Sequence, residues 1–308
     1  MSTRKPNFLI IGAPRCGTTY LAKNLASHPD VFLTTGENAD IAGDVHFFDA
    51  NTDQGRRNLA KGTDWYFSLF SGAGTAQAVG EKTADYLIDP DAPSLIADTL
   101  EHPRIIIMIR DPVERAWSHF CHSRHRLPSH LKFKDLVEQG GDIGGIPILT
   151  AGLYARHLQP YINRFGSHNI LILVKEDIDH SPGEELARAC SFLRINAEYT
   201  SPHLETYVNA GSSSTLATAT ARAGRALKSR FPRAYHSVTR GPFAKPVAFS
   251  IRLLRGKTND RITRHDGPRK APLDAALRRQ LRDYYRSDVD AMSHFMKRNL
   301  NKLWWDDN

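Results

Sequence analysis

Cysteine is scarce in this sequence, and long hydrophobic runs are missing from it. Its 308 residues include three cysteines, Cys16, Cys121 and Cys190, which are scattered and lack metal-ligand spacing. An odd, scattered set argues against a disulfide framework and suits a reducing compartment. No apolar run reaches the roughly eighteen residues that a membrane-spanning helix needs, and the polar residues 1–7 do not resemble a signal peptide. We therefore expect a cytoplasmic protein.

Acidic residues are almost absent from one basic stretch of the chain. The formal net charge is +8, but residues 222–264 contain twelve Lys or Arg and a single acid, Asp260. This stretch is either a solvated basic face or a surface for an anionic acceptor, a cofactor or the periphery of a membrane. Aromatic residues do not interleave with these cations in a stacking pattern, so we expect no nucleic-acid partner.

Three continuous apolar runs alternate with helical patterns. Residues 7–13, 104–109 and 169–174 read NFLIIGA, RIIIMI and NILILV, which is typical of strands buried on both faces. A stretch with helical spacing follows each of them, and another closes the chain at residues 271–305. This alternation predicts an α/β fold with a central parallel sheet flanked by helices.

The basic stretch interrupts the alternation. Residues 210–262 are rich in Ser, Ala, Arg and Pro and contain only short apolar groups. We expect a single domain over residues 1–308, with residues 210–262 as a basic helical excursion or lid within it.

A glycine-containing loop follows the first predicted strand. Residues 12–19 read GAPRCGTT and precede a predicted helix. Such a loop turns backbone N–H groups and the positive end of a helix toward one point, where an anion can bind. An ordinary tight turn is the alternative, but the charge and hydroxyl groups of the loop favour phosphate binding. The candidate ligand-binding residues are Pro14, Arg15, Cys16, Gly17, Thr18 and Thr19.

The glycine spacing in this loop is that of a nucleoside-triphosphatase, but two of the expected groups are missing. Thr18 stands where the lysine that reaches the β- and γ-phosphates is needed. The second strand does not end in an obvious metal-binding acid, because Arg110 precedes Asp111. We therefore expect a phosphate ligand bound by protein cations, without a metal. A kinase or triphosphatase and a basic anion-binding module are the alternatives.

A second pair of a cation and a hydroxyl follows the second predicted strand. Arg110 lies at the end of that strand, and Ser118 comes eight residues later in a predicted helix. A guanidinium and a hydroxyl placed in this way can converge on one phosphate group. Taken separately, Arg110 is equally well explained as an ion-pair partner and Ser118 as a helix-surface residue.

Together these segments resemble the sulfotransferase superfamily that uses 3′-phosphoadenosine 5′-phosphosulfate (PAPS). PRCGTT at 14–19 resembles its 5′-phosphosulfate loop, and RDPVERAWS at 110–118 resembles its 3′-phosphate motif. GDVHFFD at 43–49 and GEKTADY at 80–86 resemble the heparan-sulfate-type and bacterial carbohydrate branches. The resemblance covers residues 7–200 and implies a P-loop-containing sulfotransferase-like fold. It also implies an enzyme that transfers a sulfuryl group to a hydroxyl of a carbohydrate, a glycolipid or another metabolite.

The resemblance also implies a set of catalytic residues. The catalytic carboxylate falls on Asp44, one methylene shorter than the glutamate of the family. His46 is the rival base because a neutral imidazole titrates near neutrality. Lys82 would hold Asp44 ionised or touch the transferring sulfonate, and Arg15 would stabilise charge on the sulfonate and on the leaving phosphate.

Two further sets of residues complete the expected site. His46, Lys82 and Tyr86 are the candidates for binding the acceptor. Near the C-terminus, Arg269 and Lys270 weakly resemble the family loop that covers the 3′-phosphate, although a basic surface turn explains them nearly as well.

Overall fold

A computed structural model describes residues 4–34, 43–205 and 273–306 of the chain. The fold that they form belongs to the unit made of Met1–Leu204 and Leu273–Asn308. The predicted lid at 210–262, the basic stretch 222–264 and the candidates Arg269 and Lys270 lie outside the described residues.

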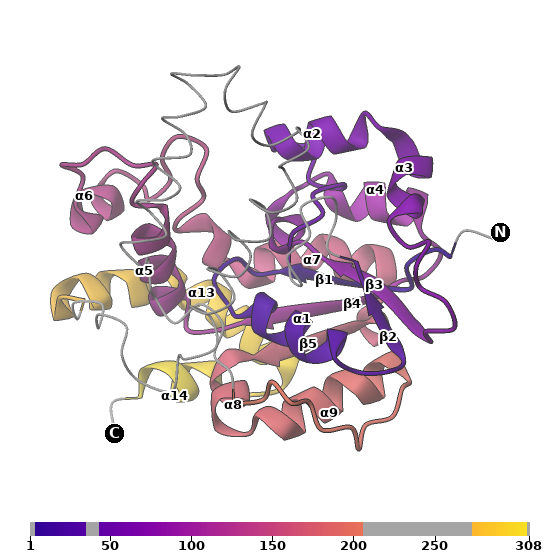
Figure 1. Cartoon of the computed structure of the whole chain (residues 1–308). Coiled ribbons are helices and arrows are strands. Elements are labelled where there is room, and N and C mark those ends of the chain that lie inside the picture. The colour runs from indigo at the N-terminus through magenta and orange to yellow at the C-terminus, as the bar shows by residue number, and fades with distance from the viewer. Residues whose placement is uncertain (1–3, 35–42, 206–272, 307–308) are drawn as a thin grey trace, which may run out of the picture. The chain divides into compact units, whose positions relative to one another are not determined.

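Five parallel strands form the sheet of the described residues, in the order β2-β3-β1-β4-β5 (Figure 1). The strands are β1 (Phe8–Gly12), β2 (Val31–Leu33), β3 (Ala78–Lys82), β4 (Arg104–Ile109) and β5 (Ile170–Val174). The three apolar runs of the sequence are β1, β4 and β5, and every residue of β1 is buried. The predicted α/β class with a central parallel sheet is confirmed.

Helices cover both faces of this sheet (Figure 1). The α-helices are α1 (Thr18–Ala26), α2 (Asp53–Leu59), α3 (Gly62–Ser68), α4 (Ala92–Thr99), α5 (Pro112–Ser123), α6 (Phe133–Glu138), α7 (Tyr154–Phe165), α8 (Lys175–His180), α9 (Pro182–Leu193), α13 (Ala275–Met296) and α14 (Leu300–Trp305). Short 3₁₀ helices are η1 (Ala84–Ile88), η2 (Thr150–Gly152) and η3 (Ser167–Asn169).

The direction of the crossovers decides which helix covers which face. The connection from β1 to β2 runs toward one edge of the sheet, and that from β3 to β4 runs toward the other. Because such connections are right-handed, α1 and α4 lie on opposite faces. α1 packs against α9, and α4 packs against α7.

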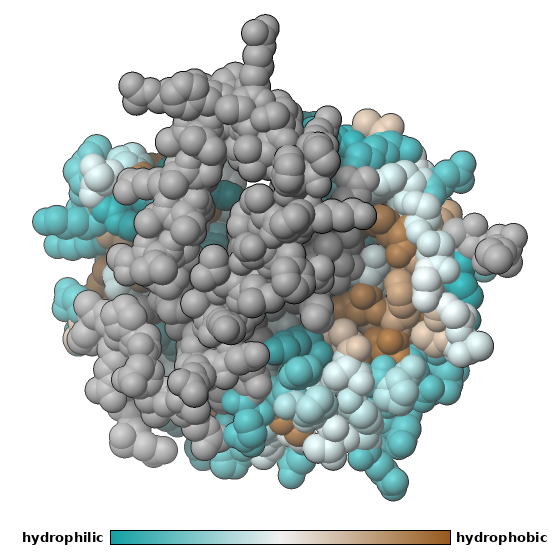
Figure 2. Space-filling model, viewed as in Figure 1, coloured by the Kyte–Doolittle hydropathy of each residue, from teal (hydrophilic) through white to brown (hydrophobic). Residues whose placement is uncertain are grey.

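The surface of the described residues is mostly hydrophilic in the view of Figure 2. Of their large hydrophobic side chains, Tyr284 and Leu303 are the exposed ones. In these ranges we find no helix with both the length and the apolar character needed to span a membrane.

The carboxyl ends of β3, β1 and β4 lie next to one another at the same end of the sheet, with β1 in the middle. Ligands of open parallel sheets bind at this carboxyl end. The loop 12–19 follows β1, Lys82 ends β3, and Arg110 follows β4. The fold therefore brings together segments that are far apart in the sequence.

Candidate active site

The loop after β1 leaves the start of α1 open to a ligand. Gly17 precedes α1 with a φ of 95°, a left-handed conformation that favours glycine, and no side chain of the described residues caps the helix. Arg15 is also left-handed, with a φ of 71°. The first N–H groups of a helix have no intrahelical acceptor, and they carry the positive end of its dipole. The loop is thus built to bind an anion.

The guanidinium groups of Arg15 and Arg110 lie close enough at this loop for their charges to interact, and Nη2 of Arg110 also lies 3.9 Å from Oε2 of Glu114. Nη1 of Arg110 donates to the backbone oxygen of Arg15 over 3.4 Å. The Nε atoms of both arginines are buried and lack a hydrogen-bond partner among the described residues. Burial and the charge of Arg110 lower the pKa of Arg15. A ligand with more than one phosphate group would supply acceptors for these Nε atoms and further negative charge beside the two cations, so these residues fit PAPS.

Backbone contacts fix Arg110 beside the loop. The N–H of Ala13 donates to the carbonyl of Met108 over 2.7 Å, which ties the loop to the end of β4. Tyr154 donates its hydroxyl to the carbonyl of Arg110 over 3.0 Å. Ser118 lies on the second turn of α5 and is buried. The structure therefore joins Arg15 and Arg110 directly and places Ser118 on the helix that follows them.

The side chain of Cys16 faces the protein core and not the ligand side of the loop. Its Sγ lies 3.6 Å from the hydroxyl of Tyr154, and burial raises the pKa of the thiol. Cys16 can therefore contribute only its backbone to ligand binding, and its thiol is a poor nucleophile. Among its loop neighbours, Pro14 and Thr18 are buried and Thr19 is half-buried.

A carboxylate is held at the end of β3, on the other side of β1. Oδ1 of Asp44 forms an ion pair with Nζ of Lys82 over 3.0 Å and accepts a hydrogen bond from the N–H of Ala84 over 2.9 Å. The side chain of Lys82 is 3% exposed and that of Asp44 is 33% exposed. These two contacts fix Oδ1 of the carboxylate. The arrangement leaves Oδ2 of Asp44 able to take a proton from a bound hydroxyl group.

Gly12 brings this carboxylate close to the anion-binding loop. A β-carbon at Gly12 would lie 2.6 Å from Cβ of Leu87 and 2.9 Å from the carbonyl oxygen of Ala84. Glycine is therefore required where β1 passes η1. Since Ala84 also binds Asp44, the carboxylate and the start of the loop are separated by a single residue of η1.

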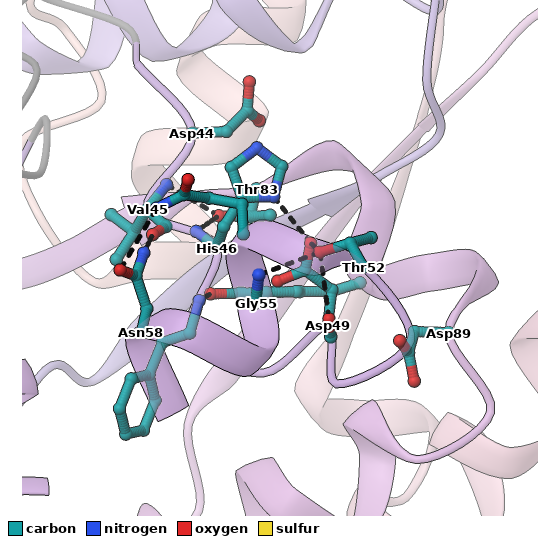
Figure 3. Close-up of polar contacts among 12 residues, drawn as sticks. Asp44, Val45, His46, Asp49, Thr52, Gly55, Asn58, Thr83 and Asp89 are labelled. Atoms are coloured by element: carbon teal, nitrogen blue, oxygen red, sulfur yellow. Dashed lines mark hydrogen bonds and ion pairs between the residues drawn. The ribbon is translucent and has the colours of Figure 1, made fainter. Parts of the chain in front are cut away.

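His46 lies beside Asp44 and is paired with a second carboxylate (Figure 3). Its Nδ1 lies 2.6 Å from Oδ2 of Asp49, which is fully buried. Burial lowers the pKa of His46, but the hydrogen bond and the charge of Asp49, together with Asp44 and Asp85, outweigh it and raise the pKa. A raised pKa increases the share of the imidazolium form of His46, which donates hydrogen bonds and takes no proton. Asp44 and His46 both stay candidates for the base.

Asp85 is a member of this cluster that sequence analysis missed. Ligand atoms of His46, Asp49 and Asp85 lie within 4.8 Å of one another, close enough to hold a metal ion. The metal-free site expected from the sequence stays a prediction. Burial raises the pKa of Asp85 to about 6. The sequence signal that could have pointed to Asp85 is its position three residues after Lys82, in the same segment of residues 80–86.

Replacing Asp85 by asparagine should stabilise the protein at neutral pH. Burial raises the pKa of this carboxyl from 3.8 to about 6, so its ionisation costs folding free energy as the pH rises through that range. Asparagine has the shape of the neutral carboxyl and no charge. We expect a gain of about 1 to 3 kcal/mol in the free energy of unfolding at pH 7.5 and a much smaller gain at pH 4, measured by urea denaturation. An equal gain at both pH values would contradict this origin.

Tyr86 does not reach the acceptor side of the site. Its side chain is fully buried. Its hydroxyl accepts from the N–H of Phe47 and donates to Oε1 of Glu81, each over 2.8 Å. The prediction that Tyr86 binds the acceptor is wrong, because both hydrogen-bonding directions of the hydroxyl are used inside the core.

Comparison with known proteins identifies the family. A family model described as "Sulfotransferase domain" matches residues 5–216. The chain belongs to the sulfotransferase family. The solved sulfotransferase from Alicyclobacillus acidocaldarius has a TM-score of 0.55 and 24% sequence identity, and the match covers 75% of this chain and 97% of that one. The expected sulfotransferase fold is thereby confirmed.

Sulfotransferases of the heparan-sulfate branch are among the curated relatives. Mouse heparan sulfate glucosamine 3-O-sulfotransferase 3B1 is 30% identical over 206 residues, covering 66% of this chain and 49% of the relative. Mouse heparan sulfate glucosamine 3-O-sulfotransferase 6 is 31% identical over 213 residues, covering 67% and 57%. The chain thus spans about half the length of these relatives. The matches confirm the resemblance read from residues 43–49 and 80–86.

Proposed function

We propose that this protein transfers the sulfuryl group of PAPS to a hydroxyl group of a carbohydrate acceptor. The observation that carries the proposal is that cations and a carboxylate lie side by side at the carboxyl ends of three neighbouring strands. The paired cations Arg15 and Arg110 follow β1 and β4, and the Asp44–Lys82 ion pair lies at the end of β3. PAPS bound at the loop 12–19 would have its leaving phosphate at the end of β1. Asp44, the proposed proton acceptor, would then lie on the side of β3.

The chain supplies donor binding from two strand ends. The N–H groups of the loop 12–19 and the guanidinium of Arg15 would bind the 5′-phosphosulfate, and Arg110 and Ser118 would bind the 3′-phosphate. The unpartnered Nε atoms of Arg15 and Arg110 support this assignment. Arg15 would also neutralise the charge that develops on the leaving phosphate during transfer.

Asp44 is the proton acceptor in this proposal. As the acceptor oxygen forms its bond to sulfur, the bond from sulfur to the 5′-phosphate oxygen breaks. The hydroxyl proton passes to Oδ2 of Asp44, and 3′-phosphoadenosine 5′-phosphate leaves. Lys82, 3.0 Å from Oδ1, would hold the carboxylate in place through their ion pair. The imidazolium of His46 would donate a hydrogen bond to the acceptor or to the sulfonate.

The carbohydrate acceptor rests on the branch of the family. The relatives described above are named as heparan sulfate sulfotransferases, and the sulfotransferase family model matches a region that includes Asp44 and Lys82. A surface of charged and hydrogen-bonding groups around Asp44, His46 and Asp85 suits a ligand rich in hydroxyl groups.

Nucleotide binding should separate this function from that of a phosphate-loop kinase. Isothermal titration should show tight binding of 3′-phosphoadenosine 5′-phosphate and much weaker binding of ATP with magnesium, because Thr18 replaces the triphosphate-binding lysine. Transfer of labelled sulfate from PAPS to polysaccharide fractions then tests the reaction. A preference for ATP would overturn the proposal.

A further inference from the structure

A carboxylate is buried beneath the proposed catalytic segment. Glu81 lies in β3 and is fully buried, yet no cation of the described residues forms an ion pair with it. Its Oε1 accepts hydrogen bonds from the hydroxyls of Tyr66 over 3.0 Å and of Tyr86 over 2.8 Å, and its Oε2 accepts from the hydroxyl of Thr83 over 2.8 Å. Burial raises the pKa of Glu81 to about 7, although these hydrogen bonds oppose it. A group that is so costly to bury calls for a role.

The carboxylate sets the direction of two of these hydroxyls. A hydroxyl has one hydrogen to donate and two lone pairs that accept. Since the hydrogens of Thr83 and Tyr86 point to the carboxylate, their lone pairs are free for backbone donors. The N–H groups of Val45 and His46 donate to Oγ1 of Thr83 over 3.0 and 3.1 Å, and that of Phe47 donates to the hydroxyl of Tyr86 over 2.8 Å. Three consecutive amides are thereby fixed, and Figure 3 shows Val45 and His46 beside Thr83.

These amides belong to the segment that carries Asp44 and His46. His46 has a φ of 54°, a left-handed conformation that is unfavourable for a residue with a β-carbon. Such a conformation persists only where its surroundings hold it. The amides of His46 and Phe47 flank this residue and are both among those fixed. From the opposite side, the side-chain amide of Asn58 donates to the carbonyl of Val45 over 2.8 Å.

We propose that Glu81 is a positioning residue for sulfuryl transfer, acting through the hydroxyls of Thr83 and Tyr86 on the backbone of residues 44–47. The inference rests on the proposed function for its link to catalysis. Glu81 has no contact with a substrate in this arrangement. It orients the hydroxyls, the hydroxyls hold the strained backbone, and that backbone aims the side chains of Asp44 and His46.

Thr83 and Tyr66 offer a matched pair of variants. Thr83→Val keeps the shape of the side chain and removes the acceptor for two amides. Tyr66→Phe removes a hydrogen bond to the same carboxylate, but the Tyr66 hydroxyl makes no hydrogen bond to residues 44–47. We expect Thr83→Val to lower kcat at least tenfold with unchanged KM for PAPS, and Thr83→Ser to restore most of it. Tyr66→Phe should keep kcat within about twofold of the parent, although it too loses stability.

Glu81→Gln tests the origin of the effect. An amide replaces one acceptor oxygen by a donor, so at least one hydroxyl must reverse its direction. We expect kcat to fall at least tenfold while the affinity for 3′-phosphoadenosine 5′-phosphate stays the same. The proposal would be overturned if kcat fell in proportion to the loss of stability, to the same degree in Tyr66→Phe as in Thr83→Val.

A readout without turnover separates this proposal from the proposed function. Amide hydrogen exchange of a peptide containing residues 44–47 should speed up at least tenfold in Thr83→Val and Glu81→Gln and stay unchanged in Tyr66→Phe. If the parent protein transfers no sulfate but the three variants show this exchange pattern, the proposed function fails. The positioning of residues 44–47 by Glu81 then still stands. Unchanged exchange in all three variants would refute the positioning itself.

Discussion

Replacing Asp44 by asparagine should nearly abolish sulfuryl transfer. The side-chain oxygen of asparagine can still accept from the N–H of Ala84, which keeps the local backbone contact. The variant loses the ability to take the hydroxyl proton, and it also loses the ion pair with the buried Lys82, whose cost urea denaturation measures separately. We expect kcat to fall by about a hundredfold to ten-thousandfold, with nucleotide affinity almost unchanged, as measured by labelled-sulfate transfer and by calorimetry.

His46 provides the comparison for this experiment. Its raised pKa favours the imidazolium form, and if His46 serves as a hydrogen-bond donor, as proposed, His46→Asn should retain part of the turnover. Near-normal kcat in Asp44→Asn together with complete loss in His46→Asn would move the role of base to the histidine.

Replacing Arg110 by alanine should weaken binding of 3′-phosphoadenosine 5′-phosphate far more than binding of adenosine 5′-phosphate. Arg110 is mostly buried, and its Nε has no partner among the described residues, so its loss would leave a buried 3′-phosphate without its charged contact. We expect a loss of about 2 to 5 kcal/mol for the first ligand and little for the second, measured by isothermal titration.

Arg15→Ala is the control for the other end of the nucleotide. Arg15 lies in the loop that would bind the 5′-phosphate, which both ligands share. Its removal should therefore weaken the two ligands by similar amounts. Equal losses for the two ligands in Arg110→Ala would instead show that Arg110 does not recognise the 3′-phosphate.

The fold could be predicted from the sequence only where strands are apolar throughout. β1, β4 and β5 are such runs. One candidate phosphate-binding motif follows β1, and the other follows β4. β3 reads AVGEK and is fully buried, but its glutamate and lysine break the apolar signal. β2 has three residues, too few for any period to be recognised.

The proposed site could be predicted in part, through short motifs. Asp44, His46 and Lys82 were identified by resemblance, and the structure brings them together. The hydrogen bonds of Glu81 and Thr83 could not be predicted, because they reach segments about forty residues away or depend on burial. Tyr86 was misassigned for the same reason, since the sequence does not show that its hydroxyl is used in the core.

The central position of β1 has a consequence for how such a protein can change during evolution. Groups suited to bind the proposed nucleotide follow β1 and its neighbour β4, and Lys82, at the end of the other neighbour β3, pairs with Asp44 on the side proposed for the second substrate. The two sides meet where Gly12 passes Ala84, so mutations that spare this contact can accumulate on one flank of the middle strand with little effect on the other. New second substrates could thus be acquired while the nucleotide site is inherited.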